Sequence, residues 1–214
     1  RKDYLNGALN KDTRYLYDMG LLVQERDGAN NVLNEYTHGV HLGGGIGGLL
    51  HLKQGTNPYC YLYDGKGNVT ALLNNQAQVA ATYHYDPFGQ LRGWAGGVTQ
   101  PMQFSTKPYD EKTGLSFYGY RSYVPALGRW LTRDPLGEVV GINLYEFVNN
   151  NPVNFLDPNG LKTVIPNPFP PGCSRGPSCD PYRKCGRLDL YAVCMAFPDD
   201  PWGNCVRSCL LKRW

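Results

Sequence analysis

The stretch Tyr61-Leu-Tyr63-Asp64-Gly-Lys-Gly67 decides the fold, because it recurs within the first hundred residues. It reappears as Tyr83-His-Tyr85-Asp86-Pro-Phe-Gly89, and an earlier copy reads Tyr15-Leu-Tyr17-Asp18-Met-Gly20. The aspartates of the last two copies are 22 residues apart, and the first two lie 46 apart, about two such spacings. A period of this size is typical of stacked repeats, in which no unit buries its apolar face alone.

The chemistry of one repeat predicts a β-hairpin. The Tyr-x-Tyr pair places both rings on one face of a strand, because side chains alternate between the two faces. The following Asp and Gly favour a tight turn. Second strands are expected at residues 68–73 and 79–85, with a turn at 74–76 between them. The alternative is an ordinary β-meander in which the Tyr-Asp pairs coincide by chance.

The composition of the 214 residues supports a mainly β protein with two unlike segments. Tyr outnumbers Phe by 16 to 7 and charged residues make up 18%, which argues against a charge-rich helical bundle. Residues 1–161 carry 13 Lys/Arg against 14 Asp/Glu, whereas residues 162–214 carry 8 against 4. Six of the seven cysteines also lie beyond residue 161. A domain boundary is therefore expected near Leu161.

The repeats and the segment that follows them resemble the RHS/YD-repeat family. Residues 108–161 resemble its C-terminal signature, the RHS repeat-associated core, as shown by Gly114-Leu-Ser-Phe-Tyr-Gly-Tyr-Arg-Ser-Tyr123, Gly128-Arg-Trp-Leu-Thr-Arg-Asp-Pro-Leu-Gly137 and Asn149-Asn-Asn-Pro-Val-Asn-Phe-Leu-Asp-Pro-Asn-Gly-Leu161. The resemblance divides the chain into YD repeats (1–107), the core (108–161) and a variable C-terminal tip (162–214).

The resemblance implies a β-shell that encloses a C-terminal polypeptide. In toxin members of the family the core cuts the chain after the Leu of an Asp-Pro-x-Gly-Leu sequence. Here the cut would fall between Leu161 and Lys162, at the boundary already indicated by cysteine content and charge. YD-repeat hairpins would then form the end of the shell, followed by a small cysteine-rich, partly helical tail.

Cleavage chemistry is expected from two aspartates in matching frames, Asp134-Pro-Leu-Gly137 and Asp157-Pro-Asn-Gly160. A carboxyl pair can hydrolyse a peptide when one group activates water and the other protonates or polarises the amide. The resemblance places an Arg-Asp pair at this site, so we predict Arg133, Asp134 and Asp157 as catalytic residues. The alternative is ordinary turn chemistry, which is our interpretation of Asp86 in Asp86-Pro-Phe-Gly89.

Other sites are less well supported by the sequence. His38, His41 and His51 lack neighbouring ligands at metal spacing, so no metal and no cofactor is expected. The Gly43–Gly48 run has neither a Gly-Lys-Ser/Thr sequence nor a dinucleotide-binding pattern. We interpret it as a place where the backbone turns or approaches another segment closely.

The tail begins with a Pro-rich linker, residues 165–172, and continues with short helices expected at 187–197 and 202–211. So small a domain needs cross-links, and its cysteines permit three disulfides in fifteen pairings. A zinc site and reduced thiols are the alternatives. The segment contains neither a Cys-x2-Cys pair nor a histidine, which argues against zinc. No toxin enzyme motif is recognisable in it. The disulfide candidates are Cys173, Cys179, Cys185, Cys194, Cys205 and Cys209.

Two functions follow from this reading. The first is the C-terminal part of a bacterial polymorphic toxin used in interbacterial competition, whose shell holds a cargo released by autoproteolysis after Leu161. The second is a non-enzymatic surface or secreted module that adheres to partners or binds carbohydrate, with a remnant tail. Expected partners are the N-terminal remainder of the same shell, an immunity protein, secretion-system components and a target-cell surface; nucleic acid is left open.

Neither a signal peptide nor a membrane span is recognisable in the sequence. The family resemblance and the disulfide candidates imply a location at the cell surface or the exterior, reached through a secretion system.

Overall fold

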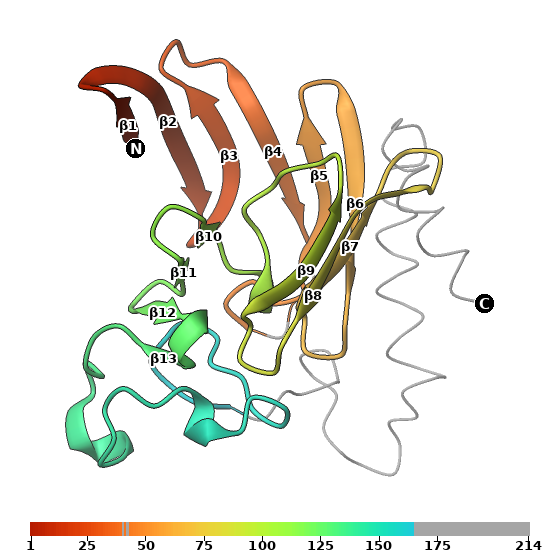
Figure 1. The fold of residues 1–214 in the computed structure, drawn as a ribbon. Helices are drawn as coiled ribbons and strands as arrows, with labels where there is room; N and C mark the ends of the chain where they lie inside the picture. The colour runs from red at the N-terminus through yellow and green to blue at the C-terminus, as the bar shows by residue number, and fades with distance from the viewer. Residues whose placement is uncertain (40, 42, 165–214) are drawn as a thin grey trace.

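The computed structural model describes residues 1–39, 41 and 43–164, and its main element is a nine-stranded antiparallel sheet. Each strand pairs with the next along the chain, so the order in space is the order in sequence (Figure 1). The strands are β1 (Lys2–Leu5), β2 (Ala8–Asp18), β3 (Leu21–Asp27), β4 (Val32–His38), β5 (Leu49–Gln54), β6 (Asn57–Tyr63), β7 (Val69–Leu73), β8 (Val79–Tyr85) and β9 (Leu91–Gly96).

Each of the three Tyr-Asp copies contains a shift in the register of strand pairing. The register with the next strand shifts between Leu16 and Tyr17, between Leu62 and Tyr63, and between His84 and Tyr85, at the second Tyr of each copy. Bulges of this kind bend a strand and increase its twist. The nine strands accordingly curl into an open arc rather than a flat sheet (Figure 1).

The turns after the last two copies are built by their aspartates, as predicted. Asp64 Oδ1 accepts the amides of Lys66 and Asn68 at 2.9 and 3.0 Å. Asp86 Oδ1 accepts the amides of Phe88 and Gln90, both at 3.0 Å. The strands predicted at residues 68–73 and 79–85 are also present, as β7 and β8.

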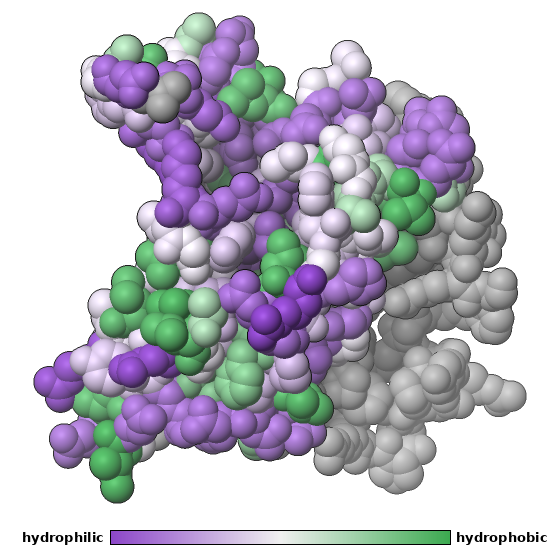
Figure 2. Space-filling view, viewed as in Figure 1, coloured by the Kyte–Doolittle hydropathy of each residue, from purple (hydrophilic) through white to green (hydrophobic). Residues whose placement is uncertain are grey.

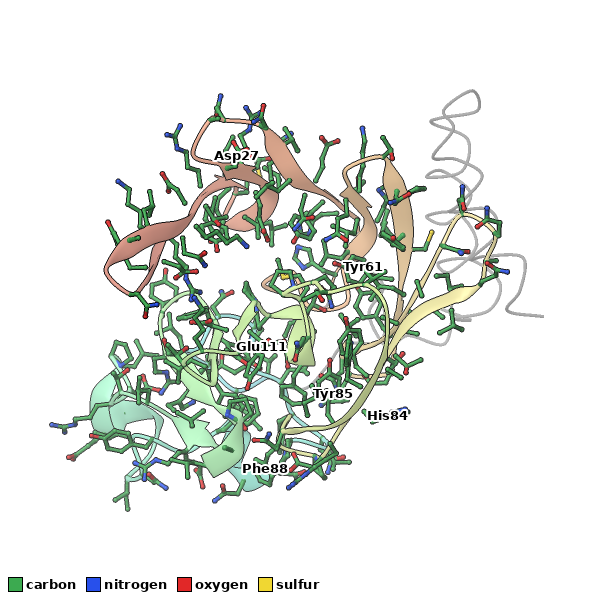
Figure 3. The ribbon with its side chains drawn as sticks, turned by 45° about the horizontal axis from the view of Figure 1, so that its top comes forward. Asp27, Tyr61, His84, Tyr85, Phe88 and Glu111 are labelled. Carbon is green, nitrogen blue, oxygen red and sulfur yellow. The ribbon has the colours of Figure 1, made fainter. Side chains whose placement is uncertain are left out.

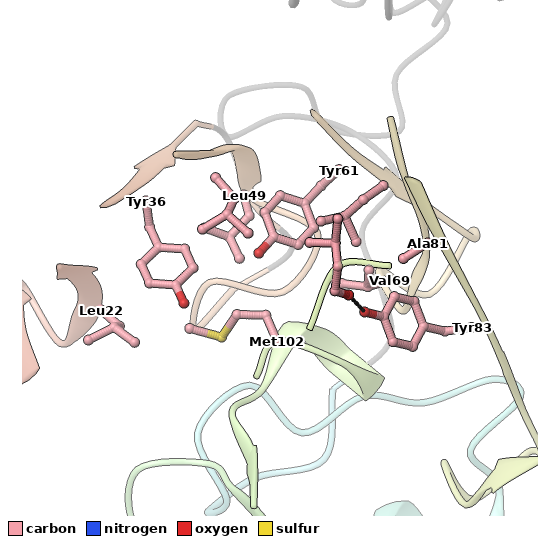
Figure 4. Packing of buried hydrophobic residues seen from close by; sticks show 11 residues of the cluster. Leu22, Tyr36, Leu49, Tyr61, Val69, Ala81, Tyr83 and Met102 are labelled. Carbon is pink, nitrogen blue, oxygen red and sulfur yellow. Dashed lines mark hydrogen bonds between the residues drawn. The ribbon is translucent and has the colours of Figure 1, made fainter. Parts of the chain in front are cut away.

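The inner face of the arc carries the first hydrophobic core. Tyr61 and Tyr83 are both buried here, whereas His84 and Tyr85 point to opposite sides of β8 (Figure 3). Residues 97–103 lie against this face, where Met102 joins the core and Tyr83 donates a hydrogen bond to the carbonyl of Val98 (Figure 4). The alternation of side chains in the repeat therefore places Tyr61 and Tyr83 on the packed inner face.

A second, smaller sheet follows in the core segment. It contains β10 (Tyr109–Asp110), β11 (Leu115–Phe117), β12 (Ser122–Val124) and β13 (Arg129–Trp130), paired in sequence order. Short 3-10 helices interrupt the segment at η1 (Phe104–Thr106), η2 (Pro125–Leu127), η3 (Gly137–Val140) and η4 (Val148–Asn150).

An aromatic cluster joins this sheet to the repeats. Its buried members are Phe104, Tyr118, Tyr123, Trp130, Phe147 and Val148, with Tyr85 and Phe88 of the repeats packed against it. Tyr123 also donates a 2.7 Å hydrogen bond to the carbonyl of Phe88. The core segment therefore docks on the last hairpin of the arc.

The mainly β fold class is confirmed over the described residues. The expected linker, helices and cysteine candidates of residues 165–214 lie outside them. Within the described part of the chain, no helix is long and apolar enough to cross a membrane.

Candidate functional site

The carboxylate of Asp157 organises the turn that contains the predicted cut. Its Oδ1 accepts the amides of Asn159, Gly160, Leu161 and Lys162, at 3.2, 2.7, 3.1 and 3.3 Å. The last of these is the nitrogen of the Leu161–Lys162 peptide bond. Asp157 is thus a turn residue, as Asp86 is, but its carboxylate also touches the bond at which cleavage is predicted.

One buried arginine connects the two predicted aspartates. Arg121 Nη1 lies 2.7 Å from Asp134 Oδ2, and its Nη2 lies 3.4 Å from Asp157 Oδ2. The side chains of Arg121, Asp134 and Asp157 are only 3%, 7% and 3% exposed. Asp134 and Asp157 are therefore brought to one site, as the sequence predicted, with a guanidinium between them.

The guanidinium of Arg121 has two further contacts. Its Nε donates to the carbonyl of Gly160, next to the predicted cut, and its central carbon lies 4.3 Å from the centre of the Trp130 ring. Burial lowers the pKa of Arg121, while Asp134 and Asp157 act in the opposite direction. An arginine remains charged even after such a shift, so the site holds a fixed positive charge.

Arg133 lies elsewhere. Its residue is exposed, and within the described part of the chain its guanidinium forms no ion pair with Asp134 or Asp157. Arg121 is present in the Tyr-Gly-Tyr-Arg stretch that carries the resemblance, but nothing in its local sequence pairs it with aspartates 13 and 36 residues away. The role predicted for Arg133 stays a prediction.

A backbone pairing closes the turn of residues 157–162, which we call the cleavage turn after the predicted cut. Leu156 and Val164 exchange two hydrogen bonds, of 2.8 and 2.7 Å, on either side of it. Asp134 has a similar local role, since its Oδ1 accepts the amide of Leu136 at 2.8 Å. Both candidate carboxylates are thus fixed through one oxygen and face Arg121 through the other.

A cavity of about 770 Å³ borders the site on the side of the repeats. Its lining includes Arg121, Asn159, Lys107, Tyr118 and Gly44. The surface in Figure 2 is hollowed between the end that carries β1 and β2 and the part that carries β10–β13, where apolar residues gather. Over the described residues, no three His, Cys, Asp or Glu side chains come together as metal ligands.

The stacked Tyr-Asp hairpins agree with the resemblance to YD-repeat proteins seen in the sequence. The family model described as Teneurin YD-shell matches residues 43–153. The chain belongs to this YD-repeat family.

The relatives of the chain include toxin subunits and a nuclease. The chain is 41% identical over 93 residues to toxin subunit YenC2 of Yersinia entomophaga, covering 42% of this chain and 10% of YenC2. It is 33% identical over 159 residues to the tRNA nuclease WapA of Bacillus subtilis, covering 70% of this chain and 7% of WapA. The chain therefore spans about a tenth or less of these relatives.

A solved structure has the same fold. The complex of TcdB2 and TccC3 without its hypervariable C-terminal region matches with a TM-score of 0.59 and 27% identity, over 75% of this chain and 8% of that one. These similarities support a shell protein of the toxin type.

Proposed function

We propose that residues 1–161 form the C-terminal end of a toxin shell that cuts its own chain after Leu161 and so releases residues 162–214 as cargo. The proposal rests on one observation: the Asp157 carboxylate lies 3.3 Å from the nitrogen of Lys162 and faces Asp134 across Arg121. A turn that only needed a cap would not require two further buried charged side chains.

The two carboxyl groups take different roles in this proposal. Asp134 forms the shorter contact with Arg121, 2.7 against 3.4 Å, and is assigned as the ionised base. Asp157 is assigned as the group that passes a proton to the leaving nitrogen, because its Oδ1 lies beside that nitrogen. The guanidinium of Arg121 and the four backbone amides on Asp157 Oδ1 offset the negative charge of the two buried carboxylates.

The reaction is a hydrolysis that consumes one water. Asp134 takes a proton from the water, and the water oxygen adds to the carbonyl carbon of Leu161. That proton passes through Asp157 to the Lys162 nitrogen as the carbon–nitrogen bond breaks. The products are a carboxyl group on Leu161 and an amine on Lys162, and both aspartates return to their starting state.

Arg121 supplies fixed positive charge beside the bond as negative charge develops on the Leu161 oxygen. The sequence assigned this role to Arg133, so both arginines enter the test. The cavity beside Arg121 and Asn159 is the route by which water reaches the site.

The shell needs other regions of its polypeptide. Large apolar side chains on β1 and β2 are exposed, including Tyr4 at 62% and Tyr17 at 60%. We propose that further repeats pair with β1 and cover these side chains. Secretion, an immunity protein and interbacterial competition remain part of the proposal, supported by the toxin names of the relatives.

Cleavage is tested in the natural full-length polypeptide by gel electrophoresis and intact mass. Wild type is expected to yield two fragments, whereas Asp134→Asn and Asp157→Asn remain whole. Asp86→Asn is the matched control, because Asp86 has the same Asp-Pro-x-Gly frame away from Arg121. Arg121→Gln and Arg133→Gln test which arginine contributes to cleavage, and only Arg121→Gln is expected to slow it. An uncut wild type would refute the proposal and favour an adhesion or carbohydrate-binding module.

A further inference from the structure

The glycine run that the sequence left without a function lies against the cleavage turn. Gly44 has φ +54°, and a Cβ placed on it would overlap the carbonyl oxygen of Pro158 and approach Asn159 Oδ1 at 2.5 Å. Gly43 is also close, since a Cβ there would lie 3.2 Å from the Pro158 ring. The repeat sheet therefore contacts the turn 114 residues later, at a point where no side chain fits.

Two lysines from the repeats reinforce this contact. Lys107, only 5% exposed, donates from Nζ to the carbonyls of Gly44 and Pro158, the second at 2.7 Å. Lys66 Nζ donates to the carbonyl of Phe155 at 2.8 Å. Lys107 thus bridges the glycine loop to the cleavage turn with a single ammonium group.

The glycine loop is itself fixed to the repeats. The amide of Gly47 donates to Thr106 Oγ1 at 2.8 Å, and that hydroxyl donates to the carbonyl of Gly67 at 2.7 Å. Ile46 is fully buried. The position of residues 43–47, and of the turn that they contact, therefore depends on the folded hairpins.

We propose that Gly44 and Lys107 are positioning residues for self-cleavage: they hold the Asp157–Lys162 turn in its productive geometry, so that the core cuts only after the repeat sheet has folded beneath it. The inference rests on the proposed cleavage, and it adds a requirement that the catalytic aspartates alone do not impose. Cargo release is then coupled to completion of this end of the shell.

The first test substitutes glycines of similar backbone conformation in the natural full-length polypeptide. Gly44→Ala is compared with Gly55→Ala, whose φ is +60° and whose Cβ would meet nothing within 4 Å. Both carry the strain of a left-handed alanine, but only the first displaces Pro158. A displacement of about 1 Å at a reacting group can cost ~10²-fold in rate. We expect a loss of that order for Gly44→Ala and a change below about twofold for Gly55→Ala.

The second test uses Lys107→Met and the pH profile of cleavage. Burial lowers the pKa of Lys107 to about 8, against the opposing effect of Asp157. The other groups that face it are the Tyr118 ring at 5.2 Å and His41, whose pKa is lowered mainly by burial, then by His38 and by Lys107. The wild-type rate is expected to fall as pH rises through about 8, and this decrease should be absent from the slower Lys107→Met variant.

Hydrogen exchange separates this inference from cleavage itself. In an Asp134→Asn background, which is expected to stay whole, Gly44→Ala should speed exchange at Gly160, Leu161 and Lys162 and leave β6 and β7 protected. The inference would be overturned if Gly44→Ala and Lys107→Met both showed the same exchange at the turn and the same cleavage rate as wild type. If wild type is never cut, the proposed function fails, and exchange at the turn alone decides whether Gly44 positions it.

Discussion

Replacing Arg121 with Met should destabilise the core segment strongly. The substitution removes the 2.7 Å ion pair with Asp134, the 3.4 Å contact with Asp157, the hydrogen bond to Gly160 and the stacking on Trp130. It leaves two buried carboxylates without their counter-charge. Breaking a buried pair in this way typically costs about 3–5 kcal/mol. At roughly 2–4 °C per kcal/mol, the midpoint of unfolding should fall by about 6–20 °C.

The assay is thermal unfolding followed by near-ultraviolet circular dichroism, to which the buried Trp130 contributes. Arg129→Met is the matched control, because Arg129 also stacks on an aromatic ring, Tyr145, at 4.6 Å, but is exposed. An exposed stacking pair contributes about 0.5–1 kcal/mol. Equal losses in the two variants, or a loss below about 1 kcal/mol in Arg121→Met, would show that the Asp134–Arg121–Asp157 arrangement is not a buried ion network.

Three further changes probe the supporting structure. Gly89→Ala should lower the free energy of unfolding by about 2–4 kcal/mol, because the new Cβ meets the Phe104 ring at a residue with positive φ. Gly114→Ala should cost only about 1 kcal/mol, and equal costs in chemical denaturation would contradict the close contact between Gly89 and Phe104. Tyr123→Phe should cost about 0.5–1.5 kcal/mol through the lost bond to Phe88, and an unchanged denaturation midpoint would argue against that bond. The pKa of Lys107 is about 8 in the folded chain and near 10.5 in the unfolded chain, so the unfolded state binds more protons between these values. Wild type should therefore gain stability relative to Lys107→Met from pH 8 to 10, and a constant difference would show that folding does not lower the pKa of Lys107.

The hairpins could be predicted because their signals are local. Alternating tyrosines followed by Asp and Gly specify strand, face and turn within seven residues, and β8 begins and ends where the sequence placed it. The two candidate aspartates could also be named, since each occurs in the same recognisable frame. These features depend on neighbours in the chain.

The remainder of the site depends on contacts between distant segments. Arg121 meets its aspartates only after the second sheet folds, and Lys107 reaches Pro158 across 51 residues of sequence. The Gly43–Gly48 run was correctly interpreted as a place of close approach, but a glycine pattern does not indicate which segment approaches. Arg133 is predicted because the family resemblance places an Arg-Asp pair there, and in the structure Arg133 is exposed.

The measurement that tests the central claim most directly is the identity of the amino terminus generated in the purified full-length polypeptide. N-terminal sequencing together with the intact mass of the small fragment locates the cut to one peptide bond. The geometry of Asp157 predicts a fragment that begins at Lys162 and is absent from Asp157→Asn. A single uncut chain, or a fragment that begins at another residue, would contradict the account.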